Sequence, residues 1–266
     1  MAKKLGQLEA ALLAYCQMRN LPTVRTGELT KPLRITSKQE RELFSRMARN
    51  GILAPVRRGL YLVPPRLPLG GRWSPDEALA LNTLMEDQGG RYQVCGPNAF
   101  QRYGYDEQVP ARLYVYNNRL SGDRRIGSVA LTLIKLADSR LGATEEARTP
   151  EGLTLVYSSR VRTLMDAVYD WSRFDSLPRG YDWIRNDLTA KRVAAADLVN
   201  LTVRYGNRGT IRRIGALLAR LGASEPLLRK LQRALQPSTS LIPWVPGLPK
   251  RGTVSRRWGV VFNEQE

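Results

Sequence analysis

Hydrophobic residues recur at helical spacing between residues 37 and 49, and this stretch organises the prediction for the N-terminal part of the chain. Each residue advances about 100° around a helix axis, so Leu43, Phe44 and Met47 share one face of the predicted helix. Glu42 is the one acidic residue on the opposite face. The basic and polar residues of that face are Lys38, Arg41, Ser45 and Arg49, with Arg46 at its border.

Local signals delimit this helix and predict a β-hairpin after it. Ser37 and Glu40 are spaced for a capping box, and Gly51 supplies the residue that commonly follows a helix C-terminus. Residues 52–56 and 60–63 alternate as two short strands. The basic tip of the hairpin is formed by Arg57, Arg58 and Gly59.

Two further helices are predicted before the basic helix. They cover residues 5–19 and 27–33, the second with Thr26 as its N-cap. This order predicts a winged helix-turn-helix domain at residues 1–65, whose basic helix enters a DNA major groove and whose hairpin reaches phosphate or the minor groove. The alternative is a solvated helix face beside an ordinary hairpin. Candidate contacts to the DNA backbone are Arg25, Thr26, Lys31 and Arg34, beside Arg57 and Arg58 of the hairpin.

Residues 64–71 contain three prolines and two glycines, and we interpret residues 66–73 as a linker. Beyond it, helical and strand patterns mix, and residues 74–266 are predicted to form a larger, mostly helical α+β domain. Predicted strands cover 92–94, 112–117, 124–134 and 153–157, with a loop at 138–152. Predicted helices cover 74–87, 99–103, 159–170, 181–189, 194–205, 210–220 and 227–235, and a Pro-rich tail begins at residue 236.

Charge is distributed unevenly along the 266 residues. The net charge is +18: residues 1–70 carry +9, residues 204–257 carry +11 and the last nine residues carry −2, whereas residues 71–203 are neutral. Two basic ends favour polyanionic partners, with nucleic acid first among them. The second basic patch is expected on the outer side of the helix at 210–220 and at its start, and comprises Arg208, Arg212, Arg213 and Arg220.

The composition also argues against several kinds of site. The chain has no histidine and only two cysteines, Cys16 and Cys95, so histidine-based catalysis and zinc sites built from Cys and His are excluded. No apolar run reaches the ~20 residues of a membrane span, and no signal-peptide core is present, so we expect a cytoplasmic location without a membrane partner. We expect no cofactor, no metal and no catalytic residue.

Two features were weighed as sites of chemistry. Asp166 and Asp170 lie four residues apart on a predicted helix and could hold a metal ion, but a solvated face with arginine partners nearby is favoured. The turn at residues 206–209 could seat a phosphate at a helix N-terminus, but it lacks the lysine and threonine of a P-loop. We interpret it as a turn between helices.

Several stretches together resemble a known family, the AbiEi-type antitoxins of bacterial type IV toxin–antitoxin systems. The stretches are GILAPVRRGLYLVP, the segment 95–116, RVRTLMDAVYD, TIRRIGALLARLG and the tail IPWVPGLPKRGTVSRRWGVVFN. The resemblance covers nearly the whole chain and implies a phage-defence protein that represses its own operon by binding inverted repeats of double-stranded promoter DNA. It also implies antagonism of a nucleotidyltransferase-like toxin, which depends on the C-terminal domain and for which a stable complex is not expected.

Two other functions stay open at this point. One is an RNA-binding protein that uses the basic C-terminal region. The other is a metal-dependent enzyme that processes nucleic acid, against which the missing histidine and the absence of a tight acidic cluster argue. We therefore expect a DNA-binding repressor and antitoxin rather than an enzyme.

Overall fold

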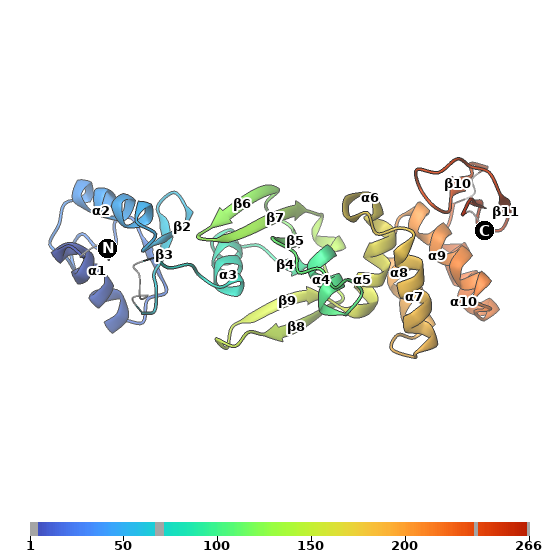
Figure 1. Cartoon of the computed structure of the whole chain (residues 1–266), viewed down its shortest axis with the longest axis horizontal. Coiled ribbons are helices and arrows are strands. Elements are labelled where there is room, and N and C mark those ends of the chain that lie inside the picture. Colours follow the sequence, from blue (N-terminus) through green and yellow to red (C-terminus); the bar gives the residue numbers. More distant parts are fainter. Residues whose placement is uncertain (1–4, 67–71, 237–238, 265–266) are drawn as a thin grey trace. The chain divides into compact units, whose positions relative to one another are not determined.

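The helix predicted from hydrophobic spacing is present as α2, Ser37–Arg49, in the computed structural model, which describes residues 5–66, 72–236 and 239–264 (Figure 1). Its N-cap is Thr36, whose hydroxyl accepts a hydrogen bond from the Gln39 amide at 3.2 Å. The Gln39 side chain accepts one from the Thr36 amide at 2.8 Å. The capping box predicted at Ser37 and Glu40 was therefore wrong by one residue.

Glu40 has a different role, which explains the shift. Its side chain is fully buried and accepts hydrogen bonds from the amides of Gly27 at 2.6 Å and Leu29 at 2.8 Å. Gly27 has φ of +102°, outside the helical region, and residues 26–34 form consecutive turns. The helix predicted at 27–33 was wrong, because Glu40 binds the amides at its start in a turn conformation.

Three short strands and one more helix surround α2. The helix is α1, Gln7–Met18, and the strands β1, Thr23–Arg25, β2, Ala54–Arg57, and β3, Leu60–Leu62, form an antiparallel sheet in the order β1-β3-β2. The Phe44 ring of α2 lies 5.1 Å from the Tyr61 ring of β3. The core that they share consists of Leu12, Leu13, Cys16, Val24, Leu29, Leu43, Phe44, Met47, Ile52, Leu53 and Val63.

The described residues fall into two compact units. The first comprises Met1–Tyr92, Ala111–Leu136 and Ala147–Leu155, and the second comprises Gln93–Pro110, Ala137–Glu146 and Val156–Glu266. Residues on both sides of the predicted linker thus belong to the first unit, and residues 67–71 of that linker lie outside the described ranges.

The first unit continues with a helix and part of a sheet. Helix α3, Glu77–Asp87, is capped by Asp76, which accepts a hydrogen bond from the Leu79 amide at 2.7 Å, so the helix begins three residues later than the predicted start at residue 74. Strands β5, Leu113–Asn117, and β7, Val129–Lys135, pair in parallel, and β6, Gly122–Ile126, pairs antiparallel with β7.

These strands belong to a six-stranded sheet of order β6-β7-β5-β4-β9-β8. The remaining strands are β4, Tyr92–Val94, β8, Thr144–Arg148, and β9, Thr154–Ser158, and the boundary between the units falls within each of them. Strand β4 pairs with β9 in parallel, with Val94 opposite Tyr157. Both β8 and the short 3-10 helix Asp138–Arg140 lie where a loop was predicted at 138–152.

The second unit is mostly helical. Its helices are α4, Gly96–Arg102, α5, Arg160–Tyr169, α6, Trp171–Phe174, α7, Arg179–Thr189, α8, Ala195–Tyr205, α9, Arg208–Arg220, and α10, Glu225–Arg233. Helix α5 contacts α4, α6, α7, α8 and α9, and it is buried from Arg162 to Val168. It is therefore the central helix of this unit.

The Pro-rich tail forms a small sheet that the sequence patterns did not predict. Strands β10, Ile242–Pro243, and β11, Thr253–Ser255, flank β12, Val260–Phe262 (Figure 1). Trp244 and Trp258 of this segment are 1% and 2% exposed, which places them among the largest fully buried side chains. Burial of two tryptophans is the main apolar contribution that fixes the tail.

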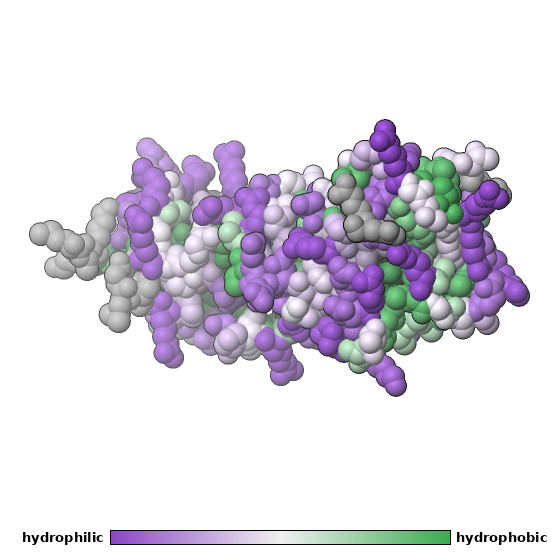
Figure 2. All heavy atoms as spheres, turned by 45° about the vertical axis from the view of Figure 1, so that its right-hand side comes forward, coloured by the Kyte–Doolittle hydropathy of each residue, from purple (hydrophilic) through white to green (hydrophobic). Residues whose placement is uncertain are grey.

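The structure confirms a mixed α+β fold. Figure 2 shows that hydrophilic residues cover most of the visible face, with hydrophobic residues gathered in smaller patches between them. Within the described ranges, no helix has both the length and the apolar character needed to span a membrane.

Candidate nucleic-acid interface

The outer face of α2 is exposed and basic, as the helical spacing predicted. Lys38, Arg41, Ser45 and Arg49 are all exposed, whereas Leu43, Phe44 and Met47 are buried. In the part of the chain that the structure describes, Lys38, Arg41 and Arg49 form no ion pair. Their charges are therefore available to an external partner.

Arg46 differs from its neighbours on α2. Its Nε donates a hydrogen bond at 2.9 Å to Oε1 of Glu9 on α1, and its side chain is 48% exposed. The pair connects the first helix to α2, so Arg46 at the border of the basic face is partly engaged within the protein. Glu9 was not identified from the sequence, because the two residues lie 37 positions apart.

The turn before α2 brings further candidate residues to the surface. Lys31 and Arg34 are exposed, and neither forms an ion pair with any described residue. The Thr26 amide donates a hydrogen bond to the Gly59 carbonyl at 3.0 Å, which joins this turn to the hairpin tip. Arg34 has φ of +52°, a left-handed conformation that a non-glycine residue adopts only in turns such as this.

The two arginines of the hairpin have different surroundings. Arg57 is the last residue of β2, and its Nε and Nη2 donate hydrogen bonds at 2.6 and 2.7 Å to the two carboxylate oxygens of Asp87 on α3. Arg58 lies in the turn, is exposed and forms no ion pair among the described residues. Of the two predicted wing contacts, Arg58 is the one whose charge is free.

Asp87 is the organising acidic residue of this region. Its side chain is 3% exposed, and it also pairs with Arg25 of β1, Nη1 to Oδ1, at 2.9 Å. The hydrogen bond from Arg57 lowers the pKa of Asp87 well below its ordinary value, against the opposing effect of burial. No sequence pattern predicted this contact, because Asp87 lies at the end of a helix that was predicted as part of another domain.

The second basic patch is not the outer surface that was predicted. Arg212 and Arg213 are each only 7% exposed, so their placement on the outer side of α9 was wrong. Nε of Arg212 donates to the Trp258 carbonyl at 2.7 Å, and its Nη2 donates to the carbonyls of Ser240 and Gly259. The tail sheet covers this face of α9, and main-chain carbonyls take the place of water.

Arg208 and Arg220 of that patch are exposed but partly engaged, whereas Arg213 is buried. Arg213 donates to the Pro243 carbonyl at 3.1 Å, and burial lowers the pKa values of both Arg212 and Arg213. Arg220 donates to Glu264 near the end of the chain, and Arg208 makes a long contact of 3.5 Å with the Gln236 carbonyl. Arg208, at the start of α9, keeps most of its charge available.

The environment of Asp166, one of the two acidic residues considered for metal binding, also differs from the prediction. Asp166 is 1% exposed and accepts a hydrogen bond from Arg162 Nε at 2.8 Å, so the solvated face that was favoured was wrong at this position. Burial raises the pKa of Asp166 to about 6. In the described ranges, no group of three His, Cys, Asp or Glu side chains is placed to hold a metal ion.

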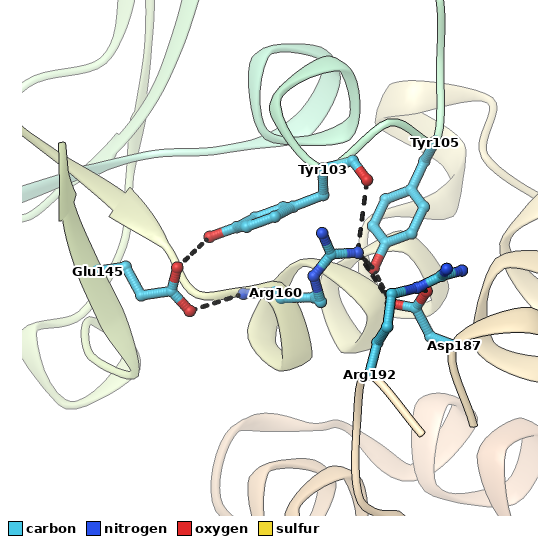
Figure 3. A network of polar contacts seen from close by, with 6 residues as sticks. All are labelled: Tyr103, Tyr105, Glu145, Arg160, Asp187 and Arg192. Atoms are coloured by element: carbon cyan, nitrogen blue, oxygen red, sulfur yellow. Dashed lines mark hydrogen bonds and ion pairs between the residues drawn. The ribbon is translucent and has the colours of Figure 1, made fainter. Parts of the chain in front are cut away.

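A polar network in the second unit was missed by sequence analysis (Figure 3). Its centre is the buried carboxylate of Asp187 on α7, which accepts hydrogen bonds from the Tyr105 hydroxyl, from Arg192 Nε at 2.6 Å and from Arg160 Nη1 at 3.2 Å. Burial alone would raise the pKa of Asp187, but these hydrogen bonds outweigh it and lower that pKa.

The network extends from Asp187 toward strand β8. The Arg160 guanidinium lies 4.9 Å from the centre of the Tyr103 ring, and the Tyr103 hydroxyl donates to Glu145 at 3.0 Å. Burial raises the pKa of both Tyr103 and Tyr105, so neither is prepared to lose a proton near neutral pH. The polar groups of this network bind one another. We therefore assign the network a structural role, in which it joins α5, α7 and β8.

Comparison with known proteins adds one finding about the fold. No protein-family model matches the chain, and no curated protein matches it. Among solved structures, it is similar to the crystal structure of the RV2827C protein from Mycobacterium tuberculosis, with a TM-score of 0.57 and 16% sequence identity. The alignment covers 97% of this chain and 92% of that chain, so the likeness extends over the whole described fold.

Proposed function

We propose that this protein binds double-stranded DNA through the exposed face of α2, with the β2–β3 hairpin as a wing. The observation that carries the proposal is the set of unpaired cations on one face of a helix whose other face is buried. An α-helix with its side chains is about 10–12 Å across, and the major groove of B-DNA is about 12 Å wide. Arg41 and Arg49 would reach base edges, and Lys38 and Ser45 would contact bases or phosphate.

The surroundings of α2 support this orientation. The order α1, β1, α2, β2, β3 with an antiparallel β1-β3-β2 sheet is compatible with a winged-helix arrangement. Lys31 and Arg34 precede α2, and Arg58 lies at the hairpin tip, so unpaired cations flank the helix in the sequence on both sides. Such flanking cations would contact phosphates and set the position of the helix without reading sequence.

The biological role that fits this activity is autoregulation. We infer a repressor that binds inverted repeats in its own promoter and that serves as the antitoxin against a nucleotidyltransferase-like toxin. Its support is the resemblance of the sequence to AbiEi-type antitoxins, including the segments that fold into α5, α9 and the tail sheet. Proteins of this kind act in the cytoplasm, without a stable toxin complex.

The decisive experiment measures affinity for promoter DNA from the upstream region of the gene. Arg41→Ala with Arg49→Ala should weaken binding and reduce discrimination between the operator and a scrambled duplex, because each base-reading arginine contributes ~1–3 kcal/mol. The matched control is Lys135→Ala with Arg148→Ala, which removes two exposed cations from strands of the six-stranded sheet. An equal loss in both double variants would mean that only net charge matters, and the assignment of α2 would be wrong.

Transfer RNA in the same titration distinguishes the RNA-binding alternative. We expect the operator duplex to displace the protein from tRNA at fixed salt, and log affinity for duplex to fall with log salt by about 0.9 per phosphate contacted. Preference for tRNA over every duplex would contradict the proposal. Affinity for duplex that does not change with salt would contradict it equally.

A further inference from the structure

Four arginines surround one hollow in the second unit, whereas the proposed DNA-binding face of α2 belongs to the first unit. The hollow has a volume of about 340 Å³, and its lining residues come from the start of α9, the end of α10 and the tail segment just before β12. Its walls include Arg208, Arg212, Arg256, Arg257 and Trp258. All these residues belong to the same compact unit.

The positive charge around this hollow is poorly balanced. Arg212 is 7% exposed, and its hydrogen-bond acceptors are main-chain carbonyls rather than a carboxylate. Arg257 pairs with Glu225 at 2.9 Å, but Glu225 also pairs with Arg229, and it is the one acidic residue between positions 204 and 257. The local charge is therefore strongly positive even after the ion pairs are counted.

Two of the arginines keep most of their guanidinium donors available, since Arg208 makes only the 3.5 Å contact with the Gln236 carbonyl. Arg256 is exposed and forms neither an ion pair nor a side-chain hydrogen bond with the described residues. Arg208 is exposed at the first position of α9, where the partial positive charge of a helix N-terminus adds to its own. The first turn of α9 contains no acidic residue. A helix that begins in this way is stabilised by an anion next to it.

Trp258 forms part of the wall but offers no donor to a ligand. The residue is 2% exposed, and its indole nitrogen is fully buried, so that nitrogen is not accessible from the hollow. The chemistry of the hollow is therefore set by its arginines. A group that only accepts hydrogen bonds and carries negative charge would satisfy them.

We infer that this arginine hollow binds the polyphosphate group of a small nucleotide-like molecule. Guanidinium groups bind phosphate oxygens through paired charge-assisted hydrogen bonds, and several arginines around one hollow match the several oxygens of a di- or triphosphate. The volume of about 340 Å³ lies at the lower end of the ~300–1,000 Å³ typical of small-ligand sites. The inference does not depend on the proposed DNA-binding function, since none of its residues belongs to the first unit.

The test is calorimetric titration of the full chain with pyrophosphate and with ATP at low salt. We expect saturable binding of both probes, and Arg256→Ala should raise the Kd about tenfold or more, because it removes charge-assisted hydrogen bonds from an exposed position. The matched control is Arg233→Ala, which removes an exposed arginine from the last turn of α10. Arg233 does not line the hollow, so its Kd should stay within about twofold of the unchanged protein.

Three results would overturn the inference. The first is no saturable binding of pyrophosphate or ATP, and the second is an equal loss of affinity in Arg256→Ala and Arg233→Ala. The third is binding of a 5′-phosphorylated oligonucleotide at the hollow without binding of either small probe. Operator affinity measured in parallel separates the two proposals, because Arg256→Ala should leave it unchanged and Arg41→Ala with Arg49→Ala should leave pyrophosphate binding unchanged.

Discussion

Helices α2 and α9 have the same length of 13 residues and similar arginine-rich polar faces, but they use their arginines in opposite ways. On α2, Arg41 and Arg49 are exposed and unpaired among the described residues. On α9, Arg212 and Arg213 are 7% exposed and donate hydrogen bonds to main-chain carbonyls of the tail. One helix presents its charges to a partner, and the other uses them to hold the chain's own C-terminal segment.

The difference shows what a charge pattern on a helix determines. It defines which face is polar, but it does not define whether water, a ligand or another part of the chain satisfies that face. Helix α2 is covered on its apolar face only, whereas α9 packs against α5, α8 and α10 and also against β12. A guanidinium group has five N–H donors, so carbonyls at the ends of short strands can satisfy it in place of water.

The largest effect on the free energy of unfolding is expected from charge reversal at the buried Arg212 of α9. Arg212→Glu would remove the donors to Trp258, Ser240 and Gly259 and place a carboxylate among carbonyl oxygens. Loss of one partner from a buried charged contact costs ~3–5 kcal/mol. Chemical denaturation should show a loss of that order for Arg212→Glu, while Arg41→Glu on α2 should change the free energy of unfolding by less than ~0.5 kcal/mol.

Equal stability of those two variants would contradict the contrast between the helices. It would mean that the tail does not depend on Arg212 for its attachment to α9. Near-ultraviolet circular dichroism of Trp244 and Trp258 should report the same event, because both indoles are buried in the tail. A lower free energy of unfolding without any change in the near-ultraviolet signal would mean that the destabilised region lies elsewhere in the unit.

A smaller effect on stability is expected from Gly215→Ala on α9. This change should destabilise the protein, although glycine-to-alanine changes within helices usually stabilise. Alanine normally stabilises a helix interior relative to glycine by about 1 kcal/mol. At this position an added Cβ would lie 2.3 Å from Cζ3 of Trp258, so the tail would have to shift. Overpacking of this kind costs ~1–3 kcal/mol. We therefore expect a lower melting temperature.

The matched substitution on α2 is Ser45→Ala, on the exposed face. Alanine has the higher helix propensity, so this variant should be equal to or slightly more stable than the unchanged protein, by up to about 0.5 kcal/mol. A stabilising Gly215→Ala would show that Trp258 does not cover α9 in solution, and the comparison between the helices would fail.

The smallest effect concerns the arginines near α2 that are held within the protein. Asp87→Asn would weaken the pairs with Arg25 and Arg57 and release both guanidinium groups toward a phosphate backbone. The released arginines, 48% and 40% exposed, would each gain at most a solvent-exposed contact of ~0–1 kcal/mol, so operator affinity should rise about two- to fivefold at most. The control is Asp123→Asn, which breaks the exposed pair with Arg112 on the sheet.

A fall in operator affinity for Asp87→Asn would reverse this interpretation. The pair would then orient the hairpin for binding, and its carboxylate would be part of the interface. Equal rises for Asp87→Asn and Asp123→Asn would show that only the net charge of the protein matters. Titration at one fixed salt concentration distinguishes these outcomes, since surface electrostatics are sensitive to ionic strength.

Elements with local signals could be predicted from the amino-acid pattern alone. The apolar spacing of Leu43, Phe44 and Met47 placed α2 and its buried face, and the glycine at position 59 marked the hairpin turn. The same spacing placed α5, α8 and α9 within a few residues of their observed bounds. These predictions depend on neighbours within about four positions along the chain, which is the range of a helical turn.

Contacts between residues far apart in the sequence could be seen only in the folded chain. Glu40 accepts hydrogen bonds from amides 11 and 13 residues away, and this contact stabilises a turn where a helix was predicted. Asp87 pairs with Arg57 of the hairpin over a separation of 30 residues. Arg212 became a buried donor because Trp258, 46 positions later, brings a carbonyl to it. Hydrophobic spacing reports which side of an element prefers to be buried, but only the folded chain supplies the acceptors that allow a charged side to be buried as well.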